Sequence, residues 1–176
     1  PVYVRDGKTL SDELKGRYGP DENTAFLIDF MKRHKDRPFL AYYTMLLPHY
    51  PWEPTPDSED PLRSVPGQQR GDSKYFPDMV AYMDKLVGRL IKSLDDLGIR
   101  ERTIVIFTTD NGSGGQITGT LNGYKVKGAK GKESEPGVCE PFIVNCPGLV
   151  PAGIETDALT DFTDLLPTFV ELGGGE

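Results

Sequence analysis

An apolar run that ends in two oxygen-bearing side chains is the feature of this sequence that most constrains its fold. Residues 104–107 are Ile, Val, Ile and Phe, which predicts a strand at 103–109 that is covered on both faces, as in a parallel sheet. Asp110 and Asn111 follow, and glycines come at 112, 114 and 115. Because open α/β sheets collect their chemistry at the carboxyl ends of strands, this stretch predicts a functional site.

Asp110 and Asn111 offer one carboxylate and one amide carbonyl, which are ligands suited to Ca²⁺ or Mg²⁺ rather than to a soft metal. An Asp-Asn-Gly sequence also occurs as a simple turn, in which the two side chains only cap the backbone. These residues alone leave both interpretations open.

Two further loops leave predicted strands and carry polar side chains. Residues 38–44 are expected to form a strand that runs into a loop with His49 between two prolines. Lys130 lies in the Gly- and Lys-rich stretch 127–141, which leads into a predicted strand at 141–146. An imidazole, a lysine and an Asp-Asn pair at strand ends suit an anionic oxyester held beside a metal ion.

Three helices are predicted around these strands. Residues 21–35 form the first, with Asp21 as its N-cap, and residues 75–97 form an amphipathic second helix. Residues 163–172 form a short third helix with Asp164 as its candidate cap. Strands that alternate with helices predict an α/β protein with a mostly parallel sheet flanked by helices.

Two segments are expected to lie outside this framework. Residues 1–20 are polar with little periodicity, which predicts a peripheral or linker segment and leaves residues 21–176 as the domain portion. Residues 54–73 are rich in Pro, Asp, Ser and Gly, which predicts a long loop.

The charge and the cysteines narrow the choice of partners. With 20 Lys plus Arg against 27 Asp plus Glu, the formal net charge is −7, which argues against nucleic acid as the main partner.

The sequence has no run of ~18 apolar residues, so no membrane span is predicted. Cys139 and Cys146 would lie roughly 23 Å apart along an extended strand, beyond disulfide reach, so we expect free thiols and leave the compartment open.

Several short motifs occur in a fixed order along the chain. They are Pro38-Phe-Leu-Ala-Tyr-Tyr43, Pro48-His-Tyr-Pro51, Tyr82-Met-Asp-Lys-Leu-Val-Gly-Arg-Leu90, Thr103-Ile-Val-Ile-Phe-Thr-Thr-Asp-Asn-Gly112, Gly128-Ala-Lys-Gly131, Glu135-Pro-Gly-Val-Cys-Glu-Pro141, Cys146-Pro-Gly148 and Thr163-Asp-Leu-Leu-Pro-Thr168. In this order they resemble the sulfatases of the alkaline phosphatase superfamily, close to the arylsulfatase A type. The resemblance covers roughly residues 20–175, and the ordered set carries it rather than any single motif.

The resemblance implies an alkaline phosphatase-like fold and the hydrolysis of sulfate esters, with a sulfated small molecule or a sulfated carbohydrate as substrate. It implies that Asp110 and Asn111 give two ligands to one Ca²⁺ ion. It also implies that His49 and Lys130 bind the sulfate group and act in catalysis. The resemblance favours a periplasmic, secreted or lysosomal location, and it leaves the oligomeric state open.

Two parts of the family's active site are not found in this sequence. One is a Cys or Ser followed by x-Pro-x-Arg, whose first residue becomes the formylglycine nucleophile. The other is a strand with paired aspartates, which supplies two more metal ligands. Cys139-Glu140-Pro141 begins like the first signature, but Ile143 stands where Arg is required. We therefore expect the middle-to-C-terminal portion of a larger enzyme, with an incomplete sheet, an incomplete Ca²⁺ site and no activity of its own.

Two other functions remain as alternatives. The first is another alkaline phosphatase superfamily hydrolase, such as a phosphodiesterase or a phosphonate hydrolase. The two-zinc members carry His where this chain has Asn111, so Asn111 favours a single hard cation. The second alternative is a non-catalytic sulfatase-like protein that kept the fold without the nucleophile.

Overall fold

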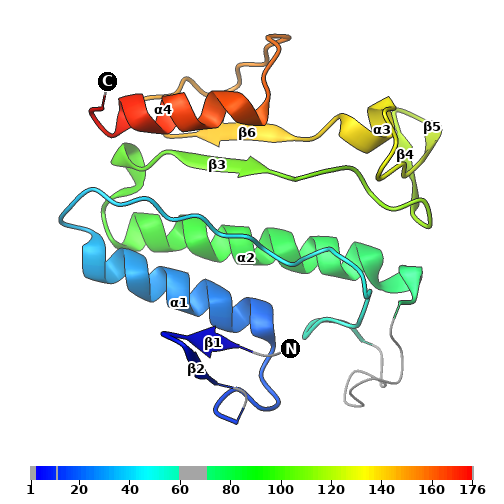
Figure 1. Cartoon of the computed structure of the whole chain (residues 1–176), viewed down its shortest axis with the longest axis horizontal. Coiled ribbons are helices and arrows are strands. Elements are labelled where there is room, and N and C mark those ends of the chain that lie inside the picture. Colours follow the sequence, from blue (N-terminus) through cyan, green and yellow to red (C-terminus); the bar gives the residue numbers. More distant parts are fainter. Residues whose placement is uncertain (1–2, 11, 60–70, 176) are drawn as a thin grey trace.

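The computed structural model describes residues 3–10, 12–59 and 71–175. The helices are α1 Gly19–His34, α2 Phe76–Asp96, α3 Glu135–Val138 and α4 Leu165–Leu172, with short 3₁₀ turns η2 Ser73–Tyr75, η3 Arg100–Arg102 and η4 Phe162–Asp164. The strands are β1 Val4–Arg5, β2 Lys8–Thr9, β3 Val105–Thr108, β4 Thr118–Leu121, β5 Tyr124–Lys127 and β6 Phe142–Asn145. Helices α1 and α2 pack together, and in the view of Figure 1 the pair β3 and β6 lies between α2 and α4.

Helix α2 is the main support of the molecule. The sequence predicts helices at 21–35 and 75–97, and α1 and α2 confirm both within two residues. Apolar side chains of α2 recur at steps of three or four residues and turn inward, and Leu86 at its centre is 0% exposed. Gly98 follows α2 with a positive φ of 68°, a conformation that glycine adopts without a steric penalty, so the helix ends where the sequence indicates.

The predicted cap of α1 is wrong. Tyr18 occupies the N-cap position, and Pro20 lies in the first turn, where its missing N–H leaves no helical hydrogen bond unmade. Asp21 therefore lies inside the first turn of α1, and its carboxylate is directed to side chains of α2.

The core consists of two clusters at opposite ends of α2. One cluster joins the first half of α2 to the loop after residue 46, and its buried members are Leu47, Trp52, Tyr75, Met79, Tyr82 and Leu86. The other joins the second half of α2 to α1, and Val105 of β3 packs against its buried members Met31, Leu94 and Ile99. Helix α2 thus fixes both the loop that carries His49 and the beginning of β3.

The described residues pair only as short antiparallel strands. Strand β3 pairs with β6, from Val105 opposite Asn145 to Thr108 opposite Phe142. Strands β4 and β5 form a hairpin, as do β1 and β2. The strands predicted at 103–109 and 141–146 are confirmed, whereas no parallel pair occurs among the described residues.

The strand predicted at 38–44 is not formed in the described part of the chain. Residues 38–46 have no helix or strand assignment, and Leu40 and Tyr42 are 69% and 88% exposed. The physical reason is that a strand needs a neighbour to hydrogen-bond with, and no described strand lies beside this segment. The segment nevertheless runs in the same direction as β3 in Figure 1.

The remaining predictions concern the ends and the long loop. The helix predicted at 163–172 is confirmed as η4 and α4. Asp164 is the N-cap residue of α4, as predicted, although its side chain makes no cap hydrogen bond there. Asp161 is the N-cap of η4, and Asp164 completes its capping box. Within the predicted loop 54–73, residues 60–70 lie outside the described residues, and the described remainder is irregular up to η2. The predicted linker 1–20 contains the β1–β2 hairpin.

Cys139 is exposed and Cys146 is buried, and both are free thiols, as predicted. In the described ranges, none of the helices combines the length and the apolar character needed to cross a membrane.

Candidate active site

The strand end that carries Asp110 and Asn111 packs tightly against α3. The amide of Asn111 donates a hydrogen bond to Asp110 Oδ1, so the two side chains lie together beyond the end of β3. The N–H of Gly112 donates to the carbonyl of Gly137 over 3.2 Å. A Cβ atom at Gly112 would lie 2.1 Å from the carbonyl oxygen of Pro136, so only glycine permits this approach.

The loop that carries Lys130 lies directly against the turn after Asn111. The N–H of Lys130 donates to the carbonyl of Ser113 over 3.0 Å, and the N–H of Gly128 donates to the carbonyl of Ile117 over 2.9 Å. A Cβ atom at Gly128 would lie 2.4 Å from the carbonyl oxygens of both Ser113 and Gly114. The backbone therefore holds the Lys130 loop and the Asp-Asn turn in one compact unit.

A cavity of about 470 Å³ opens between these segments. Its lining consists of Asp110, Asn111, Gly131, Lys132, Glu133, Gly137, Val138, Glu140 and Phe162. The structure thus brings together the predicted pair Asp110 and Asn111 and the loop next to Lys130, whose own side chain is exposed. The lysine that lines the cavity is Lys132, to which the sequence assigns no role, and it shares the cavity with acidic side chains.

Glu140 is a further polar residue of this cavity, and no pattern in the sequence predicts a role for it. The hydroxyl of Thr109 donates to Glu140 Oε2, and Glu140 Oε1 is buried with no hydrogen-bond partner among the described residues. Glu140 precedes β6, whose start lies opposite the end of β3, so antiparallel pairing brings it beside Asp110. This pairing is the signal that was missing, because the sequence analysis expects parallel strands.

His49 lies in a tight loop at the end of the extended segment. Its backbone N–H donates to the carbonyl of Leu46 over 2.8 Å, and its ring Nδ1 lies 2.6 Å from the carbonyl oxygen of Tyr50. Because a carbonyl only accepts, Nδ1 carries the proton and donates, which leaves Nε2 pointing away from this bond. His49 is exposed.

The extended segment and β3 run toward the same end of the molecule, where α3 and the β4–β5 hairpin also lie (Figure 1). In the described part of the chain, no hydrogen bond joins His49 to Asp110, Asn111 or Lys130. The structure therefore assembles the Asp-Asn turn with the Lys130 loop, and His49 makes no hydrogen bond to either of them.

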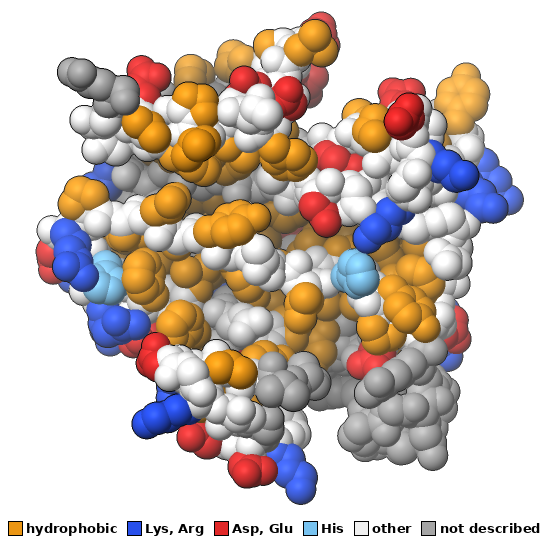
Figure 2. Space-filling model, viewed as in Figure 1, with side chains coloured by type: hydrophobic (Ala, Val, Ile, Leu, Met, Phe, Trp, Pro, Cys, Tyr) orange, Lys and Arg blue, Asp and Glu red, His pale blue; other side chains and the backbone are white. Residues whose placement is uncertain are grey.

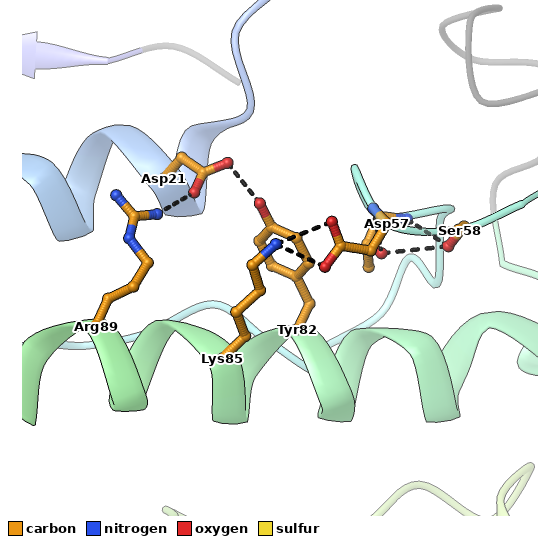
Figure 3. A network of polar contacts seen from close by, with 7 residues as sticks. Asp21, Asp57, Ser58, Tyr82, Lys85 and Arg89 are labelled. Carbon is orange, nitrogen blue, oxygen red and sulfur yellow. Dashed lines mark hydrogen bonds and ion pairs between the residues drawn. The ribbon is translucent and has the colours of Figure 1, made fainter. Parts of the chain in front are cut away.

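A polar network anchors the chain that follows His49 to α1 and α2 (Figure 3). Lys85 donates to both carboxylate oxygens of Asp57, over 2.9 and 2.7 Å. The hydroxyl of Tyr82 donates to Asp21 over 2.7 Å, and Arg89 pairs with the other oxygen of Asp21. Burial raises the pKa of Tyr82, and its hydrogen bond to Asp21 raises the pKa further. Within this network, α2 holds the start of α1 and the 55–58 turn.

The donor set of the cavity fits a hard cation. Asp110, Asn111 and Glu140 offer only oxygen atoms, and such ligands suit Ca²⁺ or Mg²⁺. The described residues contain no group of three His, Cys, Asp or Glu side chains close enough together to hold a metal ion. Asp110, Asn111 and Glu140 are fewer side chains than the six to eight oxygen ligands that Ca²⁺ takes would normally require.

An α/β fold with oxygen-bearing side chains and a lysine loop at one strand end suits the binding of a cation beside an anionic group. Comparison with known proteins identifies the family. The Sulfatase family model matches residues 4–175, and the chain belongs to the sulfatase family.

Individual relatives agree with this family. Human arylsulfatase A is 35% identical over 172 residues, which cover 92% of this chain and 29% of the relative. Human arylsulfatase D is 33% identical over 156 residues, which cover 85% of this chain and 25% of the relative. A crystal structure of Ps i-CgsB in complex with k-i-k-neocarrahexaose has a TM-score of 0.76 and 26% identity, and it covers 100% of this chain and 38% of that chain. The chain thus spans between a quarter and a third of the curated relatives named here.

These comparisons confirm the sulfatase resemblance and the α/β class. The residue roles and the identity of the metal remain predictions.

Proposed function

We propose that the whole protein is a sulfuric ester hydrolase and that this chain supplies part of its catalytic domain. The observation that carries the proposal is the compact unit of the Asp110–Asn111 turn and the Lys130 loop, in a chain of the sulfatase family. The substrate is a sulfated small molecule or a sulfated carbohydrate. The solved relative bound to k-i-k-neocarrahexaose supports the carbohydrate choice.

Asp110 and Asn111 would hold one Ca²⁺ ion through their side-chain oxygens. When bound, such an ion supplies positive charge that polarises the sulfate oxygens. Glu140 keeps the Asp-Asn turn in place through the hydroxyl of Thr109, and its second carboxylate oxygen is buried without a hydrogen-bond partner among the described residues.

Lys130 and His49 act on the sulfate group. The ammonium of Lys130 binds sulfate oxygens and stabilises the negative charge that develops on the leaving oxygen. The ring of His49 is oriented by the bond from Nδ1 to the carbonyl of Tyr50, so Nε2 is the atom that meets the substrate. A proton on Nε2 would stabilise or protonate the bridging oxygen of the ester.

We expect the family's remaining active-site groups to lie outside residues 1–176 in the whole protein. They are the formylglycine precursor in Cys-x-Pro-x-Arg or Ser-x-Pro-x-Arg and the paired aspartates that complete the Ca²⁺ shell. We propose that the strand with the aspartates adds to the sheet beside β3. Residues 38–46 and β3 run in the same direction in Figure 1, so a strand parallel to β3 would also be parallel to this segment.

Exposed apolar surface supports this completion of the sheet. Figure 2 shows hydrophobic side chains gathered on the face over β3 and β6, and Phe142 and Ile143 are 43% and 56% exposed. A cavity of about 410 Å³ separates α2 from these strands, and its apolar lining includes Met83, Val87 and Phe107. Such surface is costly to leave in water, and added strands would turn it into core.

The test is hydrolysis of an aryl sulfate by the intact protein. We expect turnover by the intact protein and none by the isolated 176-residue chain. Lys130→Ala should lower kcat by roughly 10²- to 10³-fold, as the loss of an oxyanion donor does, whereas Lys32→Ala at the far end of α1 should have no effect. An intact protein that hydrolyses aryl phosphodiesters but no aryl sulfate would refute the proposal.

A further inference from the structure

The β4–β5 hairpin is an exposed element whose role the catalytic proposal leaves unexplained. A two-residue turn joins its strands, with positive φ values of 50° at Asn122 and 83° at Gly123. Asn-Gly with this geometry is typical of the turn that gives a hairpin a fixed register. The hairpin is therefore a defined structure that can present side chains at set positions.

The two faces of the hairpin differ in chemistry. Directly opposed residues share a face, so one face carries Thr118 opposite Lys127 and Thr120 opposite Lys125. All four of these residues are exposed. The other face carries the apolar side chains, among them Leu121 and Tyr124. The name "lysine face" is used below for Thr118, Thr120, Lys125 and Lys127.

The lysine face belongs to a stretch that is free of acidic residues. Residues 111–132 contain four lysines and no Asp or Glu, although the whole chain has a net charge of −7. Lys125 and Lys127 have no ion-pair partner among the described residues. In Figure 2, Lys and Arg side chains gather at the end of the molecule that holds β4 and β5. This stretch is a local positive field on an acidic protein.

The hairpin is continuous with the candidate active site. Its base is closed by the bond from the N–H of Gly128 to the carbonyl of Ile117, and two residues later Lys130 is bonded to Ser113 of the Asp-Asn turn. Lys125 and Lys127 lie on one face of a strand and are therefore ~7 Å apart along it. Three cationic positions thus lead outward from the site, farther than one small sulfate ester can reach.

We propose that the lysine face binds additional sulfate groups of a polysulfated carbohydrate chain while one sulfate occupies the site near Asp110, an inference that rests on the proposed function. Two ammonium groups attract sulfates, and two threonine hydroxyls can donate to sulfate oxygens and donate to or accept from sugar hydroxyls. A DNA duplex fits this surface less well, because duplex binding depends on many phosphate contacts and a broad basic surface. The face therefore selects for polymeric over small sulfated substrates.

The experiment measures how dextran sulfate binds to the intact protein. Affinity electrophoresis in gels that contain dextran sulfate gives a Kd, and uncharged dextran serves as the blank. The double substitution Lys125→Gln/Lys127→Gln removes two charges from the lysine face. Lys32→Gln/Lys35→Gln removes the same charge at the far end of α1 and is the matched control. The Ki of dextran sulfate against aryl sulfate hydrolysis is measured in parallel.

We expect the hairpin variant to raise the Kd and the Ki by roughly 2- to 30-fold, which corresponds to two exposed ion pairs, and the control to change neither. The salt dependence of the Kd should also become shallower in the hairpin variant. Equal Kd values for the two double variants would overturn the proposal, and so would binding of a DNA duplex as tight as binding of dextran sulfate. If the intact protein hydrolyses no sulfate ester but shows the hairpin-dependent Kd, the proposed function fails and the binding surface stands.

Discussion

Gly128 offers the sharpest test of how the candidate site is held together. Its ideal Cβ would lie 2.4 Å from the carbonyl oxygens of Ser113 and Gly114, about 0.6 Å short of the 3.0 Å below which real Cβ contacts essentially do not occur. The obstacles are backbone atoms rather than a flexible side chain, so Gly128→Ala must push the two loops apart. The shift falls between the turn after Asn111 and the loop of Lys130.

The expected effect of Gly128→Ala is larger on catalysis than on stability. Overpacking of this kind costs ~1–3 kcal/mol of the free energy of unfolding. A displacement approaching 1 Å between groups that act on one substrate costs roughly 10- to 100-fold in kcat/KM. The assay is kcat/KM for an aryl sulfate in the intact protein, with thermal unfolding measured beside it.

Gly115→Ala is the matched control because it adds the same methyl group to the same glycine-rich turn. Its Cβ would lie 3.6 Å from the carbonyl oxygen of Gly128, an ordinary van der Waals contact. We expect Gly115→Ala to keep kcat/KM within a few-fold of the wild-type value. Wild-type activity in Gly128→Ala, or an equal loss in both variants, would refute the packing that unites the two loops.

Three further predictions concern the network behind the site and the substrate lysine. Asp21→Ala should lower the free energy of unfolding by ~2–4 kcal/mol in chemical denaturation, because it leaves the buried Tyr82 hydroxyl unpaired and breaks the partly exposed pair with Arg89. Tyr82→Phe should lower the free energy of unfolding by only ~1 kcal/mol. An equal loss in the two variants would be inconsistent with this explanation. In spectrophotometric titration, Tyr18 and Tyr82 should stay protonated well above the ordinary tyrosine pKa of about 10, since burial raises both pKa values. The stability that these two protonated hydroxyls contribute is complete below pH ~10 and is lost as the pH rises through their raised pKa values. Tyr82→Phe should remove one late-titrating group from the titration curve. Lys130→Ala should leave bound Ca²⁺ unchanged in metal analysis while activity falls, and loss of the metal would count against a role confined to the sulfate group.

Local sequence patterns predicted the helices well because their information is local. The apolar residues at every third or fourth position of α2 and the glycine after it specify a helix independently of the rest of the fold. The predicted bounds of α2 therefore agree with the observed bounds to within one residue. The start of α1 was misplaced because Asp21 is both a good cap and a good charge partner, and the partner on α2 lies 68 residues away. Such a long-range choice has no signature in the neighbouring sequence.

Strand partners and contacts at the site were harder to predict. The apolar run at 104–107 and the strand at 141–146 were identified, but pairing direction depends on which strands meet. Residues 38–44 have strand-like composition and no described partner, so composition alone gave the wrong assignment. The position of Glu140 has the same cause, since only the antiparallel pairing of β3 and β6 brings it beside Asp110.

The central claim is that Asp110 belongs to a metal site that drives sulfate ester hydrolysis, and one measurement tests it directly. Bound Ca²⁺ and aryl sulfate turnover are measured on the same preparations of the intact wild-type protein, Asp110→Ala and the control Asp29→Ala, whose side chain lies on the exposed side of α1. The account predicts that Asp110→Ala loses the metal and the activity together and that Asp29→Ala keeps both. Retention of stoichiometric Ca²⁺ and full turnover by Asp110→Ala would contradict it.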